Sequence, residues 1–195
     1  MNKEELFKIQ SNTLKVSIGD VLVSEPFLND FYFRRSAILI VDHNDEGSFG
    51  VVINKRLNVP FNDIIMGFPK FDADVYLGGP VDTDRVFFIH TIGEMIPDSH
   101  KIMSGLYWSG NINALKAMIK NDLIKPHEVR FYVGYAGWDG GQIRKELETN
   151  TWIVGKFSTK EILHTMPGKM WSTFVNKLGN RYILWNKFPV NPSDN

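Results

Sequence analysis

Residues Val133–Glu148 read VGYAGWDGGQIRKELE, and they join two kinds of secondary structure. Around the start of this stretch, Val129, Phe131 and Val133 alternate with polar or flexible neighbours, which is typical of a β-strand. Near its end, an isoleucine and a leucine lie four residues apart, which is the spacing along one face of a helix. Four glycines separate the two patterns. We therefore predict that a strand enters a glycine-rich corner and that a helix begins there.

This corner has three interpretations. The first is a phosphate site, because a helix N-terminus presents unpaired N–H groups and a partial positive charge. The glycine spacing, however, matches neither the dinucleotide-binding nor the P-loop motif. Asp139 is predicted to cap the helix, with Gln142 three residues later as in a capping box, and its carboxylate would repel a phosphate. We therefore favour the second interpretation, a structural corner. The third is a ligand site around Tyr135 and Trp138.

The order of the predicted elements indicates the fold class. Apolar patterns predict strands at 21–23, 37–41, 49–54, 75–77, 86–89, 106–108, 129–133 and 152–155. Helical spacing and capping residues predict helices at 60–65, 111–121, 142–148, 158–164 and 167–178. Strands dominate early and helices cluster late, which favours an α+β fold with a mixed or antiparallel sheet. Residues 1–17 are predicted to be a charged lead-in with a helix over 4–10, and 189–195 a polar tail.

The composition excludes several classes of function. The 195 residues carry no cysteine, which removes disulfides, thiol nucleophiles and cysteine-based zinc sites. The formal net charge is zero, although acidic residues are in excess before residue 100 and basic residues after it. The longest aliphatic run, 37–41, is far shorter than the ~20 residues that a membrane helix needs. With no apolar signal-peptide core at the N-terminus, we expect a cytoplasmic protein without membrane attachment.

The clearest local structure is a β-hairpin formed by segments 37–41 and 49–54, whose near-continuous apolar runs predict burial on both faces. Its turn contains Asp42, His43, Asp45 and Glu46, which offer ligands for a divalent cation but also suit a solvated turn. We favour the solvated turn and predict no metal site.

The open end of this hairpin is predicted to gather four cations, Arg34, Arg35, Lys55 and Arg56. Arginine pairs with carboxylates and phosphates and stacks on aromatic rings, so this end is a candidate for anion binding. We nevertheless favour ordinary surface charge that is paired with the acidic residues of the N-terminal half, and anion binding is the alternative.

The sequence contains no established catalytic motif. The five histidines lack the spacing of a zinc protease, and no serine lies in a Gly-x-Ser-x-Gly elbow. His90 ends an apolar strand, where a hydrogen-bonded structural histidine is the expected role. A triad assembled in space leaves no such motif, so the pattern leaves that possibility open. We predict no catalytic residue and no cofactor.

Several short motifs follow one another along the chain. They are Arg35-Ser36 before an aliphatic strand, Gly50-Val51-Val52-Ile53-Asn54 after a histidine-containing turn, Gly78-Gly79-Pro80-Val81 with Arg85 and His90, and Gly134-Tyr135-Ala136-Gly137-Trp138 with Gly141-Gln142 and Trp152. Together they resemble the AlgH/YqgE family of small bacterial cytosolic proteins, from about Gly19 to Gly179. The resemblance implies a single domain, residues 18–188, with a sheet bent into a partly closed barrel and flanking helices.

The resemblance implies neither an established enzymatic activity nor a cofactor. Some family members are labelled transcriptional regulators, but this chain has no helix-turn-helix pattern. We therefore expect a non-enzymatic binding or regulatory protein. An uncharacterised hydrolase acting on an anionic metabolite and a nucleic-acid-binding protein are the alternatives. The expected partner is another protein or a small anionic ligand, and a homo-oligomer is also compatible.

The candidate ligand-binding surface combines residues at strand ends and at glycine corners, where functional groups often lie. They are Arg35, Asn54, Arg85, Trp138 and Gln142. Their convergence in space is a prediction that separations of more than ~20 Å would contradict, because no single small pocket spans that distance.

Overall fold

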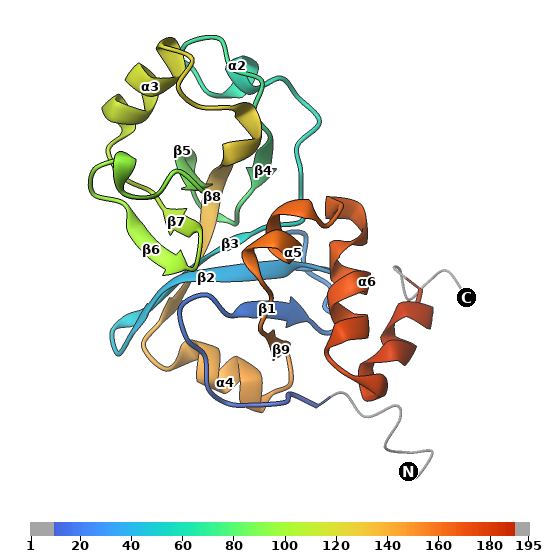
Figure 1. Cartoon of the computed structure of the whole chain (residues 1–195). Helices are drawn as coiled ribbons and strands as arrows, with labels where there is room; N and C mark the ends of the chain where they lie inside the picture. Colours follow the sequence, from blue (N-terminus) through green and yellow to red (C-terminus); the bar gives the residue numbers. More distant parts are fainter. Residues whose placement is uncertain (1–9, 190–195) are drawn as a thin grey trace.

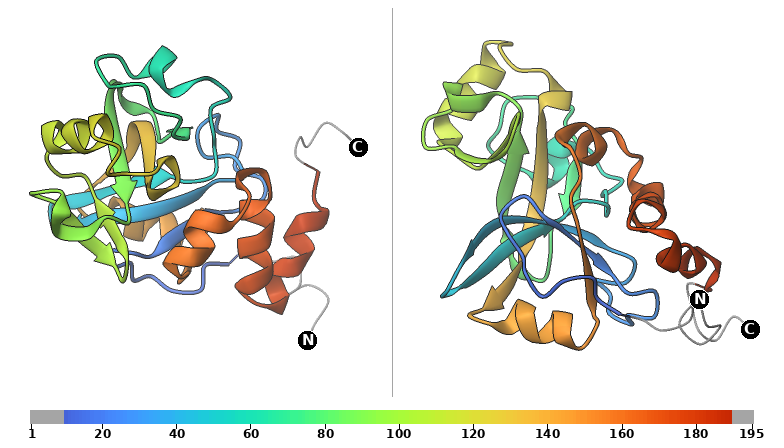
Figure 2. Two further views of the ribbon diagram at one scale, coloured as in Figure 1. Left: turned by 45° about the horizontal axis from the view of Figure 1, so that its top comes forward. Right: turned by 60° about the horizontal axis from the view of Figure 1, so that its bottom comes forward.

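The fold is organised by one long strand, β8 (Val129–Asp139), in a computed structural model that describes residues 10–189. The first part of β8 pairs with β5 (Val81–His90) on one side and with β4 (Val75–Leu77) on the other. Its last residues pair with β3 (Gly47–Val52). In Figure 1 and Figure 2, β8 therefore runs from the part of the sheet that contains β4 and β5 to the part that contains β3. The predicted strand before the glycine-rich corner is confirmed and is longer than expected.

Within residues 10–189 the strands form one nine-stranded sheet, of which only the β4–β8 pair is parallel. Beyond β3 follow β2 (Ala37–Asn44), β1 (Val21–Ser24) and the edge strand β9 (Trp152–Gly155). Beyond β5 follow β7 (Leu106–Trp108) and the other edge strand, β6 (His100–Met103). The two edge strands do not pair with each other, so the curved sheet stays open. The predicted α+β fold with a partly closed, mixed sheet is confirmed.

Gly134 marks the point where β8 changes from one set of neighbours to the other. Its φ angle is +69°, in the left-handed region that favours glycine. A Cβ atom at this position would lie 2.5 Å from the carbonyl oxygen of Gly79 and 2.9 Å from that of Val81. The close approach of β5 to β8 therefore requires glycine here.

Short helices cover the sheet on several sides (Figure 1). Helices α2 (Phe61–Ile64) and α3 (Ile112–Lys120) lie beside the part of the sheet that contains β5. Helix α4 (Gln142–Glu148) covers the part that contains β9. Helices α5 (Thr159–His164) and α6 (Pro167–Lys177) and the 3-10 helix η3 (Asn180–Lys187) lie on a third side, and two further 3-10 turns are η1 (Gly93–Met95) and η2 (Pro126–Glu128). As predicted, the Asn111 side chain caps α3 by accepting hydrogen bonds from two backbone N–H groups.

The hairpin of β2 and β3 is buried on both faces where it crosses the core. Leu39 points into the central cluster, which includes side chains from α5 and α6. Its neighbours Ile38 and Ile40 point to the opposite face and pack with the buried residues of α4. A strand that is covered on both faces needs apolar residues at successive positions rather than alternating ones. The prediction from the continuous apolar run is confirmed.

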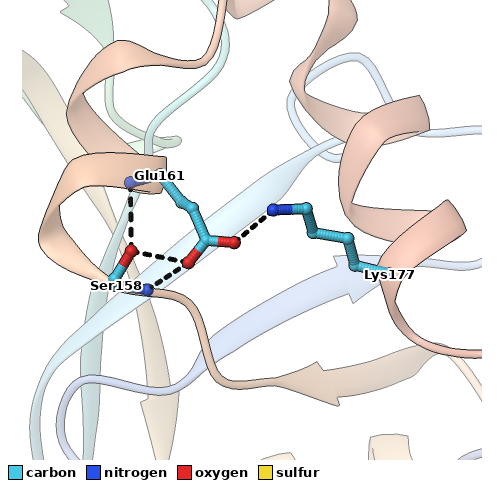
Figure 3. Close-up of polar contacts among 3 residues, drawn as sticks. All are labelled: Ser158, Glu161 and Lys177. Atoms are coloured by element: carbon cyan, nitrogen blue, oxygen red, sulfur yellow. Dashed lines mark hydrogen bonds and ion pairs between the residues drawn. The ribbon is translucent and has the colours of Figure 1, made fainter.

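An exposed polar contact links α5 to α6 (Figure 3). Ser158 and Glu161 form the predicted capping box, in which the Ser158 N–H and hydroxyl donate to the Glu161 carboxylate over 2.7 and 2.6 Å. The ammonium of Lys177 donates to the other carboxylate oxygen. These hydrogen bonds, led by that from Lys177, lower the pKa of Glu161 to about 2. The contact lies at the surface and connects the first turn of α5 to the last residue of α6.

The ends of the chain fall largely outside this description. Of the predicted lead-in helix over 4–10 and the predicted tail 189–195, only residues 10 and 189 belong to the described part. Among the helices of residues 10–189, none has the length and apolar character required to cross a bilayer.

Candidate functional site

The outer half of the β2–β3 hairpin projects beyond the core. The pairing of the two strands shifts between Ile40 and Asp42, and from Asp42 onward β2 is exposed. Such irregularities bend a strand and re-aim its side chains, and they often lie next to functional sites. The turn itself is held by Asn44, whose side-chain oxygen accepts hydrogen bonds from the N–H groups of Glu46 and Gly47. The hairpin is therefore a defined projection rather than a loose loop.

Four aromatic side chains from four strands meet beside this projection. The ring of Phe49 stacks on Tyr135, with centroids 3.9 Å apart and planes at 16°. Phe49 also contacts Trp108 at 5.4 Å, and Trp108 stacks on Phe87 at 5.7 Å. Three of the four rings are partly exposed. We call this set, Phe49, Phe87, Trp108 and Tyr135, the aromatic stack.

Two hollows adjoin the aromatic stack. An outer hollow of about 450 Å³ lies between the hairpin and β8 and is lined by Tyr135 and Trp138. An inner hollow of about 560 Å³ lies between the hairpin and β6 and is lined by Trp108. Both hollows include Asp42 and Phe49 in their walls. We refer to the two together as the hairpin groove, which has the size and the partly apolar lining of a ligand-binding site.

Both hollows of the hairpin groove are lined by ionisable residues. The outer hollow is lined by Asp42, Glu46 and Asp139. The inner hollow contains Lys101 and His100 in addition to Asp42. None of these five side chains forms an ion pair with another described residue. The three carboxylates and the Lys101 ammonium are therefore not neutralised by another described side chain.

Tyr135 and Trp138, around which the sequence predicts a ligand site, both belong to the lining of the outer hollow. Trp138 is held in place by Glu146, whose carboxylate accepts hydrogen bonds from the indole N–H groups of Trp138 and Trp152 over 2.9 and 2.6 Å. Gln142 donates to the same carboxylate over 2.9 Å. Gln142 therefore supports Trp138 but is absent from the lining of either hollow.

The predicted cap of α4 by Asp139 is wrong. Asp139 is the last residue of β8, and α4 is preceded by Gly141, with a φ angle of +77° and no side-chain cap. One half of the expected capping box does form, because the Gln142 side chain accepts a hydrogen bond from the Asp139 N–H over 3.0 Å. The Asp139 carboxylate is instead free to line the outer hollow.

Arg35 and Asn54 lie together, as predicted, but at the opposite end of the hairpin. The Asn54 amide donates to the Arg35 carbonyl and accepts from the Ala37 N–H, both over 2.9 Å. The Arg35 guanidinium lies 4.4 Å from the ring centroid of Trp171 and donates to the Phe188 carbonyl over 2.6 Å. Burial, reinforced by neighbouring Arg34, lowers the pKa of Arg35. This arginine therefore anchors the C-terminal segment.

The structure places the five predicted site residues in three different contacts. Trp138 pairs with Ser48 near the outer end of β3, whereas Asn54 follows the other end of that strand, two residues after Val52. Arg85 takes a third position, over the ring of Phe87 at 5.6 Å and paired with Asp82 at 3.1 Å. Trp138 thus belongs to the lining of the outer hollow, Arg85 lines neither hollow, and Arg35 and Asn54 belong to a separate structural contact.

Three of the four cationic side chains predicted at the open end of the hairpin contact other groups of the protein. Arg56 pairs with Asp74 over 2.8 Å, and Arg35 is engaged with carbonyl groups. Lys55 donates to the Phe31 carbonyl over 2.5 Å, and its pKa is lowered by burial and by the positive charge of Arg34. This end therefore presents less free charge than the sequence indicates.

His90 and Ser99 make the most enzyme-like contact in the described residues. Nε2 of buried His90 lies 3.1 Å from the Ser99 hydroxyl and 3.0 Å from the Ser109 carbonyl oxygen. Because a carbonyl can only accept, Nε2 carries the proton and cannot take another from Ser99. The Ser99 hydroxyl donates to the Ile96 carbonyl over 2.7 Å. The predicted structural, hydrogen-bonded role of His90 is confirmed, and burial lowers its pKa.

Comparison with known proteins finds relatives that match nearly the whole chain. A family model described as AlgH-like matches residues 21–183. A UPF0301 protein of Bacteroides fragilis is 42% identical over 192 residues, covering 98% of this chain and 97% of that protein. A UPF0301 protein of Chlorobaculum parvum is 36% identical, covering 91% and 95%.

Two solved structures share the fold. A Corynebacterium diphtheriae protein aligns with a TM-score of 0.75 at 23% identity, over 96% of this chain and all 100% of the other. The AlgH protein from Pseudomonas aeruginosa aligns with a TM-score of 0.70 at 26% identity, over 94% of this chain and 98% of the other.

Proposed function

We propose that this chain, which belongs to the AlgH-like family, is a non-enzymatic binding protein. Its ligand occupies the hairpin groove. The observation that carries the proposal is the meeting of two hollows at Asp42 and Phe49, over a stack of partly exposed aromatic rings. Three of these rings pack against the central core on one side and remain partly exposed on the other, and aromatic rings at the edge of a core often line ligand sites. A regulatory role would follow from binding at this site.

The alternative of a hydrolase depends on Ser99, which lines the inner hollow. A serine nucleophile requires a general base, and Nε2 of His90 cannot act as one while it carries a proton. No carboxylate orients the His90 ring either, because Nδ1 has no partner among the described residues. Within residues 10–189, no three His, Asp or Glu side chains are arranged to hold a metal ion. The geometry thus favours binding over catalysis by this pair.

A nucleic-acid-binding role has less support than binding of a protein or small molecule. Phosphate recognition needs a broad surface of cations, because each neutralised phosphate contributes to affinity. The hairpin groove instead exposes carboxylates at Asp42, Glu46 and Asp139. A polyanion in this groove would be repelled at one of its two ends.

A thermal-shift screen tests the proposal. Wild-type protein is mixed with amines, amino acid derivatives, aromatic carboxylates, nucleotides and short peptides. A ligand present at ~100 times its dissociation constant adds about 2.7 kcal/mol, or roughly 5 °C for a domain of this size. The shift should vanish in Glu46→Lys or Lys101→Glu, two exposed groove positions, and persist in Asp63→Lys, an exposed position on α2.

Two results would count against the proposal. A ligand whose shift survives both groove substitutions binds elsewhere. Labelling of Ser99 by a fluorophosphonate probe, detected by intact mass and absent in Ser99→Ala, would show an activated serine and support the hydrolase instead.

A further inference from the structure

Strand β9 ends the sheet, and within residues 10–189 its one strand partner is β1. Just before β9, the Thr151 carbonyl accepts a hydrogen bond from the Glu25 N–H on the β1 side, over 2.9 Å. Successive residues of a strand direct their backbone groups to opposite sides, so Trp152 and Val154 direct theirs away from β1. Such an outward row of N–H and C=O groups is a template for pairing with another chain.

Two polar side chains from the segment before β1 cover this outward row. The side-chain oxygen of Asn12 accepts from the Val154 N–H over 3.0 Å, and its NH2 group donates to the Val154 carbonyl over 2.7 Å. The Ser11 hydroxyl donates to the Trp152 carbonyl over 2.6 Å. We call Ser11 and Asn12 the edge plug. It engages three of the four N–H and C=O groups that Trp152 and Val154 direct outward.

The Asn12 amide takes the place of a neighbouring strand. In an antiparallel ladder, a residue donates one hydrogen bond to the residue opposite it and accepts one from it. A primary amide offers the same donor and acceptor on a side chain. Other contacts hold the plug in position, because the Ser11 N–H donates to the Asn150 side chain over 2.9 Å and Val16 belongs to the same buried cluster as Val154. The described residues 10–13 form no strand of their own, so the sheet stops at β9.

The sequence of β9 is suited to pairing with itself. Its four residues, Trp-Ile-Val-Gly, carry no charge and include two β-branched side chains. High β-propensity without charge favours edge-to-edge association. A twofold axis at Ile153 would place Trp152 of each copy opposite Val154 of the other, and the outward groups of both residues would then pair. These are the groups that the edge plug occupies.

We propose that the edge plug prevents strand addition at β9, and that the strand it excludes is β9 of a second copy of this chain. The plug and that strand compete for the same N–H and C=O groups, so the edge accepts one or the other. Neither the plug nor β9 lines the hairpin groove, so this inference goes beyond the function proposed above.

The variant Asn12→Ala tests the inference in purified full-length protein, where a second copy supplies the strand. Hydrogen exchange of the Val154 amide is followed by NMR at low and high protein concentration, and mass is followed by sedimentation velocity. In wild type the exchange should be slow at both concentrations. In Asn12→Ala it should be about tenfold faster at low concentration, because a hydrogen bond that protects the amide is lost. At high concentration the mass should double and the amide should become protected again.

Two further variants calibrate the result. Thr13→Ala is the matched control, because the Thr13 hydroxyl accepts from the Lys15 N–H over 3.1 Å and makes no contact with β9 among the described hydrogen bonds. It should behave like wild type. Ser11→Ala leaves Asn12 in place and removes the hydroxyl that binds the Trp152 carbonyl, so it should dimerise more weakly than Asn12→Ala.

Several results would overturn the inference. Unchanged exchange of the Val154 amide in Asn12→Ala would show that the side chain does not close the edge. Faster exchange without a gain in mass at any concentration would show that the edge opens but that a second copy does not add to it. A gain in mass while the Val154 amide still exchanges fast, or an equal gain in Thr13→Ala, would place the contact between copies elsewhere.

Discussion

Phe49 on β3 and Tyr135 on β8 stack face to face, with ring centroids 3.9 Å apart, at the centre of the hairpin groove. The contact joins the outer half of the hairpin to the strand that organises the sheet. It also places an aromatic face where Asp42 separates the two hollows. The stacked rings therefore hold the hairpin against β8 and also line the proposed site.

A double-mutant cycle measures this relationship. We expect Phe49→Ala to lower the free energy of unfolding by about 2 kcal/mol, less than the 3–5 kcal/mol typical of a fully buried phenylalanine, because the ring is partly exposed. Combining it with Tyr135→Ala should reveal a coupling of about 1 kcal/mol. Tyr135→Phe keeps the ring and should leave the coupling intact. Urea unfolding of wild type, the single variants and the two double variants gives the coupling energies, and additive effects of Phe49→Ala and Tyr135→Ala would show that the stack is incidental.

The absence of a side-chain cap on α4 changes the expected effect of replacing Asp139. A capping aspartate would lose about 1 kcal/mol of stability on replacement by alanine. Because the Asp139 side chain caps nothing, we expect Asp139→Ala to leave the unfolding free energy within about 0.5 kcal/mol of wild type. Gln142→Ala removes the hydrogen bonds to the Asp139 N–H and to Glu146 and should cost about 1 kcal/mol. If Asp139→Ala lost as much unfolding free energy as Gln142→Ala, the result would support a cap by the Asp139 side chain after all.

His90 should make stability depend on pH in a defined direction. Burial lowers its pKa below the ordinary value of 6.5 in the folded protein. Above pH 6.5 the group is neutral in both states and its contribution is complete. As the pH falls through 6.5, the unfolded chain gains a proton that the folded protein resists, so stability is lost. Urea unfolding at pH 8 and pH 5.5 should show a smaller loss in His90→Gln than in wild type. Parallel losses would assign the effect to other groups.

The sequence predicted the elements whose signals are local. The Asn111 cap, the Ser158 capping box and the two-sided burial of Ile38 and Leu39 follow from spacing alone, and each is found. Strand β6 was missed, because it contains only four residues and two of them are polar. Its place at the sheet edge depends on pairing with β7, a tertiary contact that no short window contains.

The candidate site was predicted only in part for a similar reason. Tyr135 and Trp138 stood out because they interrupt a glycine-rich stretch. Phe49 and Trp108 looked like ordinary core residues, since only the curvature of the sheet brings these distant segments together. The expected convergence of Arg35 with Trp138 ignored strand length, which places strand-end residues far apart when they occupy opposite ends of one hairpin.

Arg35 is expected to hold the C-terminal segment through geometry that lysine cannot reproduce. Its Nη2 donates to the carbonyls of Phe188 and Pro189 while the planar guanidinium lies over Trp171, and a lysine ammonium lacks the plane that stacks on the ring. We expect Arg35→Lys and Arg35→Ala each to lose about 1–3 kcal/mol of stability. Amide hydrogen exchange should rise mainly in 180–189, with β1 and β2 unchanged. Arg144→Ala, which removes an exposed pair with Glu148, is the control and should stay within about 0.5 kcal/mol of wild type. If Arg35→Lys kept the wild-type exchange rates in 180–189, positive charge alone would be sufficient to hold the segment. If either variant exchanged faster throughout the sheet, Arg35 would support the core rather than anchor the C-terminal segment.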